Sequence, residues 1–200
     1  MNASVPAPLP ARTYGSLDKH GQLMVVVVGF FTTVQLLIVQ ASDGAVPLAR
    51  LGVTLALALG CAVRYWWVIL LLPWPFRWFR MVLLLLVWCA LPVAAAMIAN
   101  PVRWGFALAA LSAIGCMTEI YNGVTRQWAV GSEGMARSLK TDHIAGAASA
   151  GVAAVGLSLV ALSRPEWLDV LIPLMVFADW VRLITMIHRH QRFIELERAT

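Results

Sequence analysis

Charged residues are scarce in this chain: aspartate, glutamate, lysine and arginine together make up 12% of its 200 residues. A soluble globular domain carries about 25% charged residues, so this shortage of charge argues against an ordinary soluble fold. Hydrophobic residues account for 60% of the chain, and the mean hydropathy is +0.79. Apolar runs of about 18 residues, the length that crosses the hydrocarbon core of a bilayer, recur along the sequence. The sequence therefore predicts a polytopic membrane protein.

Cysteine is also rare, and the first residues do not have the pattern of a secretion signal. The three cysteines, Cys61, Cys89 and Cys116, all fall inside apolar runs. Their odd number argues against a disulfide framework. The first 21 residues lack a continuous apolar core, so we expect a cytosolic N-terminal arm over residues 1–21 and no cleaved signal peptide.

Six apolar segments predict an all-α bundle of six membrane-spanning helices. They cover approximately residues 23–39, 47–72, 81–99, 104–121, 143–163 and 168–188. Together they form a transmembrane domain over residues 22–190. The loop 123–142 predicts a short amphipathic helix lying on the membrane, with Met135 and Leu139 facing lipid. Residues 191–200 predict a charged cytosolic tail that extends the sixth helix.

The distribution of lysine and arginine predicts the orientation of the bundle. With the N-terminus inside, the cytosolic segments hold ten of them: Arg12, Lys19, Arg77, Arg80, Arg126, Arg137, Lys140, Arg189, Arg192 and Arg198. The opposite face holds three: Arg50, Arg103 and Arg164. Because basic residues concentrate on the cytosolic side of membrane proteins, we expect both termini in the cytosol, in a plasma membrane or bacterial inner membrane. The net charge of +5 then reflects topology and does not indicate nucleic-acid binding.

Two opposite charges lie at matching depths inside predicted helices. Arg64 stands ten residues before Trp74, where the second span ends, and Asp179 stands nine residues before His188, where the sixth span ends. At 1.5 Å per residue, both lie about 14 Å from the cytosolic boundary. A lone charge at the centre of a span costs about 2.5–3.5 kcal/mol, so the sequence predicts an Arg64–Asp179 pair.

Further polar residues gather toward the same side of the membrane. The predicted polar cluster comprises Arg64, Asp179, Arg182, Glu119 and His143 within the spans, with Asn122, Asp142 and His190 on the cytosolic side. Three interpretations stay open: an ion pair that fixes helix register, a vestibule for an ion or proton path, and a catalytic or metal site. No HExxH motif, histidine pair at i,i+4 or nucleophile elbow occurs, so we assign no catalytic residue, metal ligand or cofactor.

The fifth predicted span is rich in small residues. Ala145, Ser149 and Ala153 recur every four residues, as do Ala147 and Gly151. Small residues at this spacing let helix backbones approach closely in a membrane. We therefore expect a helix-packing face that places this helix in the middle of the bundle or, alternatively, in an oligomer contact.

Three functional interpretations follow, in order of preference. The first is a non-catalytic subunit or scaffold of an inner-membrane assembly, which presents the 123–142 loop and the tail to partners. The alternative is a small oligomeric channel or permease with Arg64, Glu119 and Asp179 in its inner vestibule. The third is an integral-membrane enzyme that acts on a lipid-like substrate. Expected partners are the lipid bilayer and either other membrane subunits or further copies of this chain.

Overall fold

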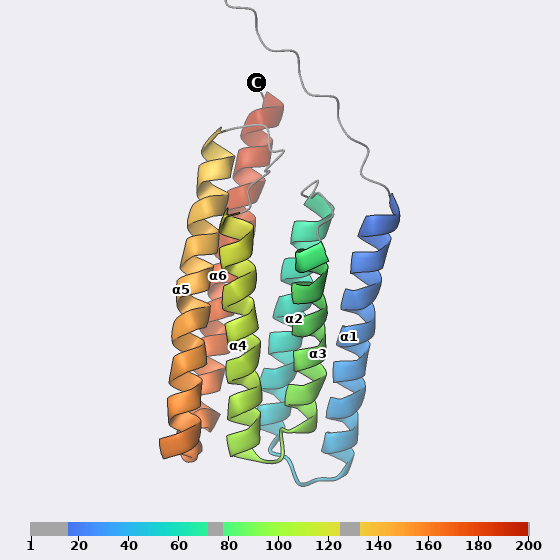
Figure 1. Ribbon diagram of the computed structural model, residues 1–200, viewed down its shortest axis with the longest axis vertical. Helices are drawn as coiled ribbons and strands as arrows, with labels where there is room; N and C mark the ends of the chain where they lie inside the picture. Colours follow the sequence, from blue (N-terminus) through green and yellow to red (C-terminus); the bar gives the residue numbers. More distant parts are fainter. Residues whose placement is uncertain (1–15, 72–77, 125–132, 200) are drawn as a thin grey trace, which may run out of the picture.

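The computed structural model describes residues 16–71, 78–124 and 133–199 (Figure 1). It contains six long helices: α1 (Ser16–Ser42), α2 (Leu48–Leu71), α3 (Trp78–Ala96), α4 (Pro101–Val124), α5 (Glu133–Ser163) and α6 (Leu168–Ala199), with a short 3-10 turn, η1 (Pro165–Trp167), before α6. No strand occurs among the described residues. All six helices are long and apolar enough to cross a membrane. The predicted all-α, multi-pass character of the chain is therefore confirmed.

The helices form a closed ring. Neighbours in contact follow the order α1, α3, α4, α5, α6, α2 and back to α1, and all six run roughly along the long axis of the molecule (Figure 1). We call the end where α1 begins and α6 ends the terminal end. The far end carries the connections 43–47, 97–100 and 164–167.

The region before the fifth span differs from its prediction. Residues 133–142 form the first turns of α5, not a separate helix lying on the membrane, and residues 125–132 lie outside the described part of the chain. Leu139 is buried, with 3% of its surface exposed, so it does not face lipid; the side chain of Met135 is not described. Residues 135–142 contain neither glycine nor proline, so nothing interrupts the helix, and its continuation carries Leu139 into the bundle.

The position of α5 also differs from its prediction. It is one member of the ring and contacts α4, α6 and η1, so it does not take the central place that its small residues predicted; the alternative, an oligomer contact, stays a prediction. Its outward face carries Val155, Leu159 and Leu162, all exposed. Small residues let a helix approach one neighbour closely, but they do not require neighbours on every side. The helix α5 therefore packs closely on α4, and its opposite side has no neighbour among the described helices.

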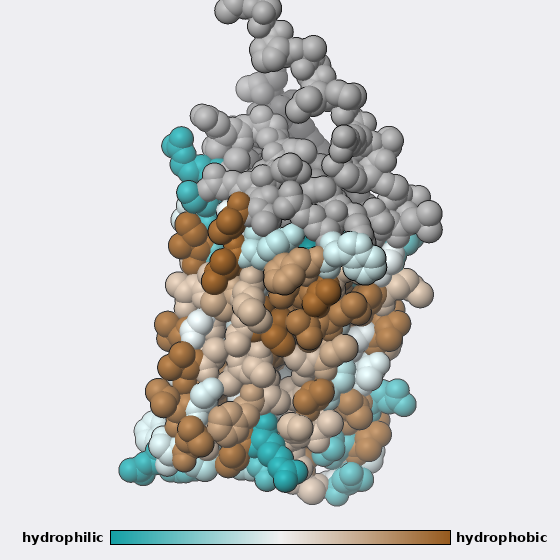
Figure 2. Space-filling view, viewed as in Figure 1, coloured by the Kyte–Doolittle hydropathy of each residue, from teal (hydrophilic) through white to brown (hydrophobic). Residues whose placement is uncertain are grey.

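The outer surface of the bundle is largely apolar. Figure 2 shows hydrophobic side chains over the flank of the bundle, with hydrophilic ones gathered along the far-end rim at the bottom of the view. Large apolar side chains are widely exposed, among them Phe31 at 64%, Phe177 at 69% and Leu162 at 71%. A soluble monomer rarely exposes so much contiguous apolar surface, whereas lipid covers it at no cost.

Two glycines mark places where helices approach closely. A Cβ added at Gly29 in α1 would lie 2.8 Å from the Cβ of Trp88 in α3. Gly60 in α2 lies against the Trp180 ring of α6, and the Trp180 Nε1–H donates to the Ala56 carbonyl oxygen at 3.0 Å. These contacts set the spacing of α1 from α3 and of α2 from α6.

The Gly29 contact predicts a matched pair of substitutions. Gly29→Ala should destabilise the bundle by about 1–3 kcal/mol because the new methyl group collides with Trp88. Gly52→Ala, in the interior of α2 with no atom near its added Cβ, should be neutral or stabilise by up to about 1 kcal/mol. Unfolding midpoints in detergent would test both, and equal midpoints for the two variants would contradict the close approach.

Candidate functional site

A cavity of about 780 Å³ lies inside the ring, lined by residues of α2, α3, α4, α5 and α6. We call it the central cavity. Its lining runs from Asn122 and His190 near the terminal end to Leu108 and Leu171 toward the far end. All eight residues of the polar cluster line it: Arg64, Glu119, Asn122, Asp142, His143, Asp179, Arg182 and His190.

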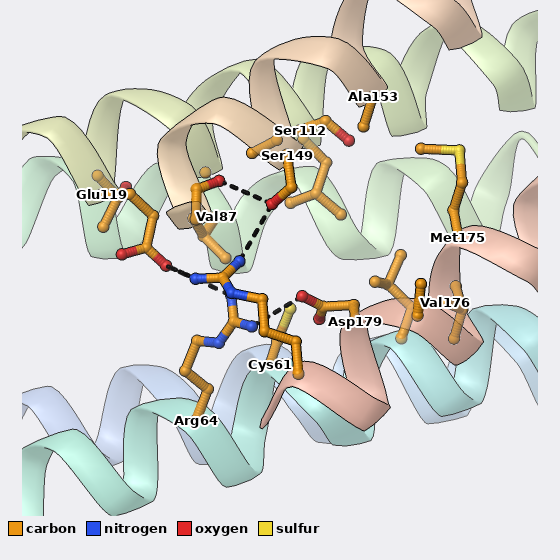
Figure 3. Close-up of a pocket in the computed structure, with 18 of the residues that line it drawn as sticks. Cys61, Arg64, Val87, Ser112, Glu119, Ser149, Ala153, Met175, Val176 and Asp179 are labelled. Atoms are coloured by element: carbon orange, nitrogen blue, oxygen red, sulfur yellow. Dashed lines mark hydrogen bonds and ion pairs between the residues drawn. The ribbon is translucent and has the colours of Figure 1, made fainter. Parts of the chain in front are cut away.

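Polarity changes along the central cavity (Figure 3). In this view Glu119 lies at one side and Met175 and Val176 at the other. Arg64 and Asp179 lie between them. The walls toward the far end are almost wholly apolar, with Leu57, Leu108, Leu111, Leu157, Leu171 and Ile172 among them. The cavity is therefore amphipathic, with its charges gathered in the half nearer the terminal end.

Arg64 joins α2 to two other helices. Its Nη2 donates to Asp179 Oδ1 of α6 at 2.8 Å, and its Nη1 donates to Glu119 Oε1 of α4 at 3.5 Å. The structure thus brings together Arg64 and Asp179, which the sequence predicts as a pair because of their matching depth in the membrane. The second carboxylate, Glu119, belongs to the same cluster but was not expected as a partner of Arg64.

Glu119 continues the network into α5. Its Oε2 lies 2.5 Å from His143 Nδ1, which donates this bond when the imidazole is neutral and Nδ1 carries the proton. Gly146 makes the approach possible, because a Cβ at that position would collide with the Glu119 carboxylate and the Arg182 guanidinium. A helix that lacks a side chain here lets two charged groups reach its backbone.

Arg182 links α6 to α5. Its Nη2 donates to the Asp142 carbonyl oxygen at 2.8 Å, and its Nη1 donates to Ser149 Oγ at 3.1 Å. The Ser149 hydroxyl in turn donates to the Gly146 carbonyl oxygen at 3.0 Å. The guanidinium also lies 3.9 Å from Glu119 Oε1, so Arg64 and Arg182 flank the same carboxylate.

A second set of contacts lies toward the terminal end of the cavity. Asp142 accepts from Arg189 Nη1 at 2.8 Å, and its other oxygen lies 3.3 Å from His190 Nε2. His190 is 4% exposed, and its Nδ1 accepts from Trp67 Nε1 at 3.5 Å. These contacts join α2, α5 and α6 where the cavity approaches the terminal end.

The predicted packing face of α5 is divided between two surroundings. Ser149 and Ala153 line the central cavity, whereas Gly151 lies against Cys116 of α4. Ala147 is half-buried and Ala145 is exposed. Residues two apart on a helix are rotated by about 200° around its axis and therefore point to nearly opposite sides. The series that begins at Ala145 and the series that begins at Ala147 consequently cannot form one face.

The far end holds an ion pair that sequence reasoning missed. Arg50 binds Asp169 through two bonds, Nε to Oδ1 at 2.6 Å and Nη2 to Oδ2 at 2.8 Å. Its Nη1 donates to the Ile98 carbonyl oxygen at 3.3 Å, and the guanidinium lies over the Trp104 ring at 5.6 Å. From the sequence, Arg50 was only one of the three basic residues expected on the face opposite the cytosol. Arg50 and Asp169 both lie near the start of a helix at the far end of the bundle. This shared position is the one feature of the sequence that could have predicted the pair.

No group of three or more histidine, cysteine, aspartate or glutamate side chains is placed to hold a metal ion within the described ranges.

No protein-family model, curated protein or solved structure matches the chain. Function is therefore inferred from the geometry of the central cavity.

The Arg64–Asp179 pair predicts non-additive stability losses. Arg64→Leu and Asp179→Leu should each destabilise the bundle by about 3–5 kcal/mol, because each leaves a charge without its main partner. The double variant should be more stable than either single variant, since Glu119 keeps its bond to His143. Reversible unfolding in mixed micelles would measure the coupling.

Arg164→Leu is the control for this cycle, because the Arg164 side chain is 74% exposed. Its effect should stay below about 0.5 kcal/mol. Losses at residues 64 and 179 that simply add in the double variant would refute an energetic pairing.

Proposed function

We propose that the protein is a membrane permease that holds a small amphipathic molecule in the central cavity. The observation that carries this proposal is the cavity itself, with its charged half and its apolar half. Ligand pockets typically measure about 300–1,000 Å³, and the central cavity, at about 780 Å³, falls in this range. A permease uses this space to hold its substrate, whereas a scaffold has no need of it.

The surroundings of the polar cluster support a ligand site over a purely structural lock. A register-fixing ion pair is expected inside close-packed side chains, because protein interiors leave few voids larger than a water molecule. Here the ion pairs border an open volume. Charged residues within membrane spans are costly and commonly mark substrate or ion pathways. A cluster that faces a cavity meets that description.

The far-end contacts support alternating access. The lining of the central cavity stops at residues such as Leu108 and Leu171. Beyond them, Arg50 and Asp169 tie α2 to α6, and Arg50 also bonds the backbone after α3. Release of a ligand at the far end requires these bonds to open. The arrangement described here is then the state with the far end closed, and a second state exchanges with it.

In this proposal the terminal end faces the cytosol. The support is the count of lysines and arginines, ten in the sequence segments assigned to that side against three in the others, because such an asymmetry is typical of the cytosolic side of membrane proteins. The polar cluster is then the cytosolic vestibule of a plasma-membrane or bacterial inner-membrane permease. A subunit or scaffold function and an enzymatic function remain predictions from the sequence, on which no contact of the described residues bears.

The cavity assignment predicts the effect of filling it. Ala153→Phe places a ring into the central cavity, which Ala153 lines, and should remove at least 90% of any small molecule that co-purifies with the protein. Val155→Phe adds a ring two residues further along α5, at a position that is 61% exposed, and should leave that molecule bound. Mass spectrometry of organic extracts from both purified variants would measure the difference. Equal amounts in the two variants would refute the site.

The orientation predicts which cysteines an impermeant reagent reaches. In a chain whose three cysteines are replaced by alanine, Asp43→Cys at the far end should react with a charged maleimide in intact cells. Arg192→Cys, near the end of α6, should react only after the cells are opened. Labelling of Arg192→Cys in intact cells would reverse the orientation.

A further inference from the structure

We propose that the central cavity takes an uncharged amphiphile whose head group donates a hydrogen bond, such as a long-chain alcohol. This inference rests on the proposed function and specifies its ligand class. It follows from three properties of the described residues: the balance of charge around the cavity, the occupation of its hydrogen-bond donors, and the acceptor that stays open.

The charges that line the central cavity balance one another. Its basic residues are Arg64, Arg80 and Arg182, and its acidic residues are Glu119, Asp142 and Asp179. The formal charges of these six side chains cancel. Inside a membrane, an added charge without a counter-charge is costly. A charged ligand would introduce that imbalance, whereas an uncharged ligand does not.

The two arginines of the polar cluster already direct both terminal nitrogens to protein acceptors. Arg64 donates to Asp179 and Glu119. Arg182 donates to the Asp142 carbonyl oxygen and to Ser149. A carboxylate, sulfate or phosphate head group is held chiefly by donors of this kind. The carboxylates of Glu119 and Asp179, which lie against the Arg64 guanidinium, would repel such a head group, so the geometry disfavours an anionic ligand.

An acceptor faces the cavity without a donor of its own. Asp179 uses Oδ1 to accept from Arg64, while its Oδ2 has no hydrogen-bond partner among the described residues, and the side chain is 36% exposed. An ionised carboxylate oxygen can only accept, so it calls for a donor on the ligand.

A hydroxyl group satisfies this position, because it can donate to Asp179 Oδ2. An ammonium group could also donate to Asp179, but the Arg64 guanidinium lies 2.8 Å from the same carboxylate and would repel it. The apolar half of the cavity, with Leu157, Ile172 and Met175 in its walls, then receives the hydrocarbon part of the ligand.

Four probes with the same oleyl chain separate these possibilities: oleyl alcohol, oleyl methyl ether, oleylamine and oleyl sulfate. Each competes with a photoreactive diazirine-bearing long-chain alcohol for the full-length protein in phosphatidylcholine nanodiscs, and mass spectrometry quantifies the labelled protein. Oleyl alcohol should compete at least tenfold better than the other three. The ether is the sharpest control because it is uncharged and lacks only the donor.

Two variants locate the effect. Ala153→Phe should reduce labelling at least tenfold, and Val155→Phe should not change it.

The outcomes distinguish the two proposals. Stronger competition by the ether, the amine or the sulfate, with labelling still sensitive to Ala153→Phe, would overturn the uncharged-donor assignment and keep the cavity as a binding site. Labelling that Ala153→Phe and Val155→Phe leave equally intense would overturn the permease proposal together with this inference.

Discussion

The structure depends on how one guanidinium, that of Arg64, is neutralised within an apolar helix. Neither neighbouring turn of α2 supplies an acidic residue, so the compensation comes from α4 and α6. Drawing Glu119 inward creates a second buried charge, which lies against His143 and is balanced in turn by Arg182. Each step brings in another helix. The polar cluster is therefore a series of charge-neutralising contacts that starts at Arg64. Together these contacts join α2, α4, α5 and α6.

These long, charged side chains also explain why the cavity can exist. Long side chains with charged ends span distances that apolar packing would have to fill, so helices held by them need not touch along their full length. Gly146 shows the same principle from the other side, because the absence of its side chain gives room to two charged groups. Toward the far end the charges are absent from the lining, and the apolar walls of the central cavity take over.

The sequence predicted position along the membrane axis better than neighbours around it. Hydropathy located six helices, and counting residues from the helix ends matched Arg64 with Asp179. Which helices lie side by side is not encoded in such counts, so the Glu119–His143 contact and the Arg50–Asp169 pair were missed. The early start of α5 was missed for a different reason: residues 133–142 are polar, and hydropathy reports burial in lipid and not helix continuity.

The Arg64–Asp179 pair has a consequence for biosynthesis. The two residues are 115 positions apart in the chain, and at about 5–20 residues per second the ribosome takes roughly 6–23 s to add the second after the first. Throughout that interval the second helix carries a cation whose main counter-ion has not been made. The last helix therefore completes the neutralisation of the second, and we expect the insertion machinery to retain early helices until the chain is nearly finished. A chain truncated before α6 should be held there or degraded.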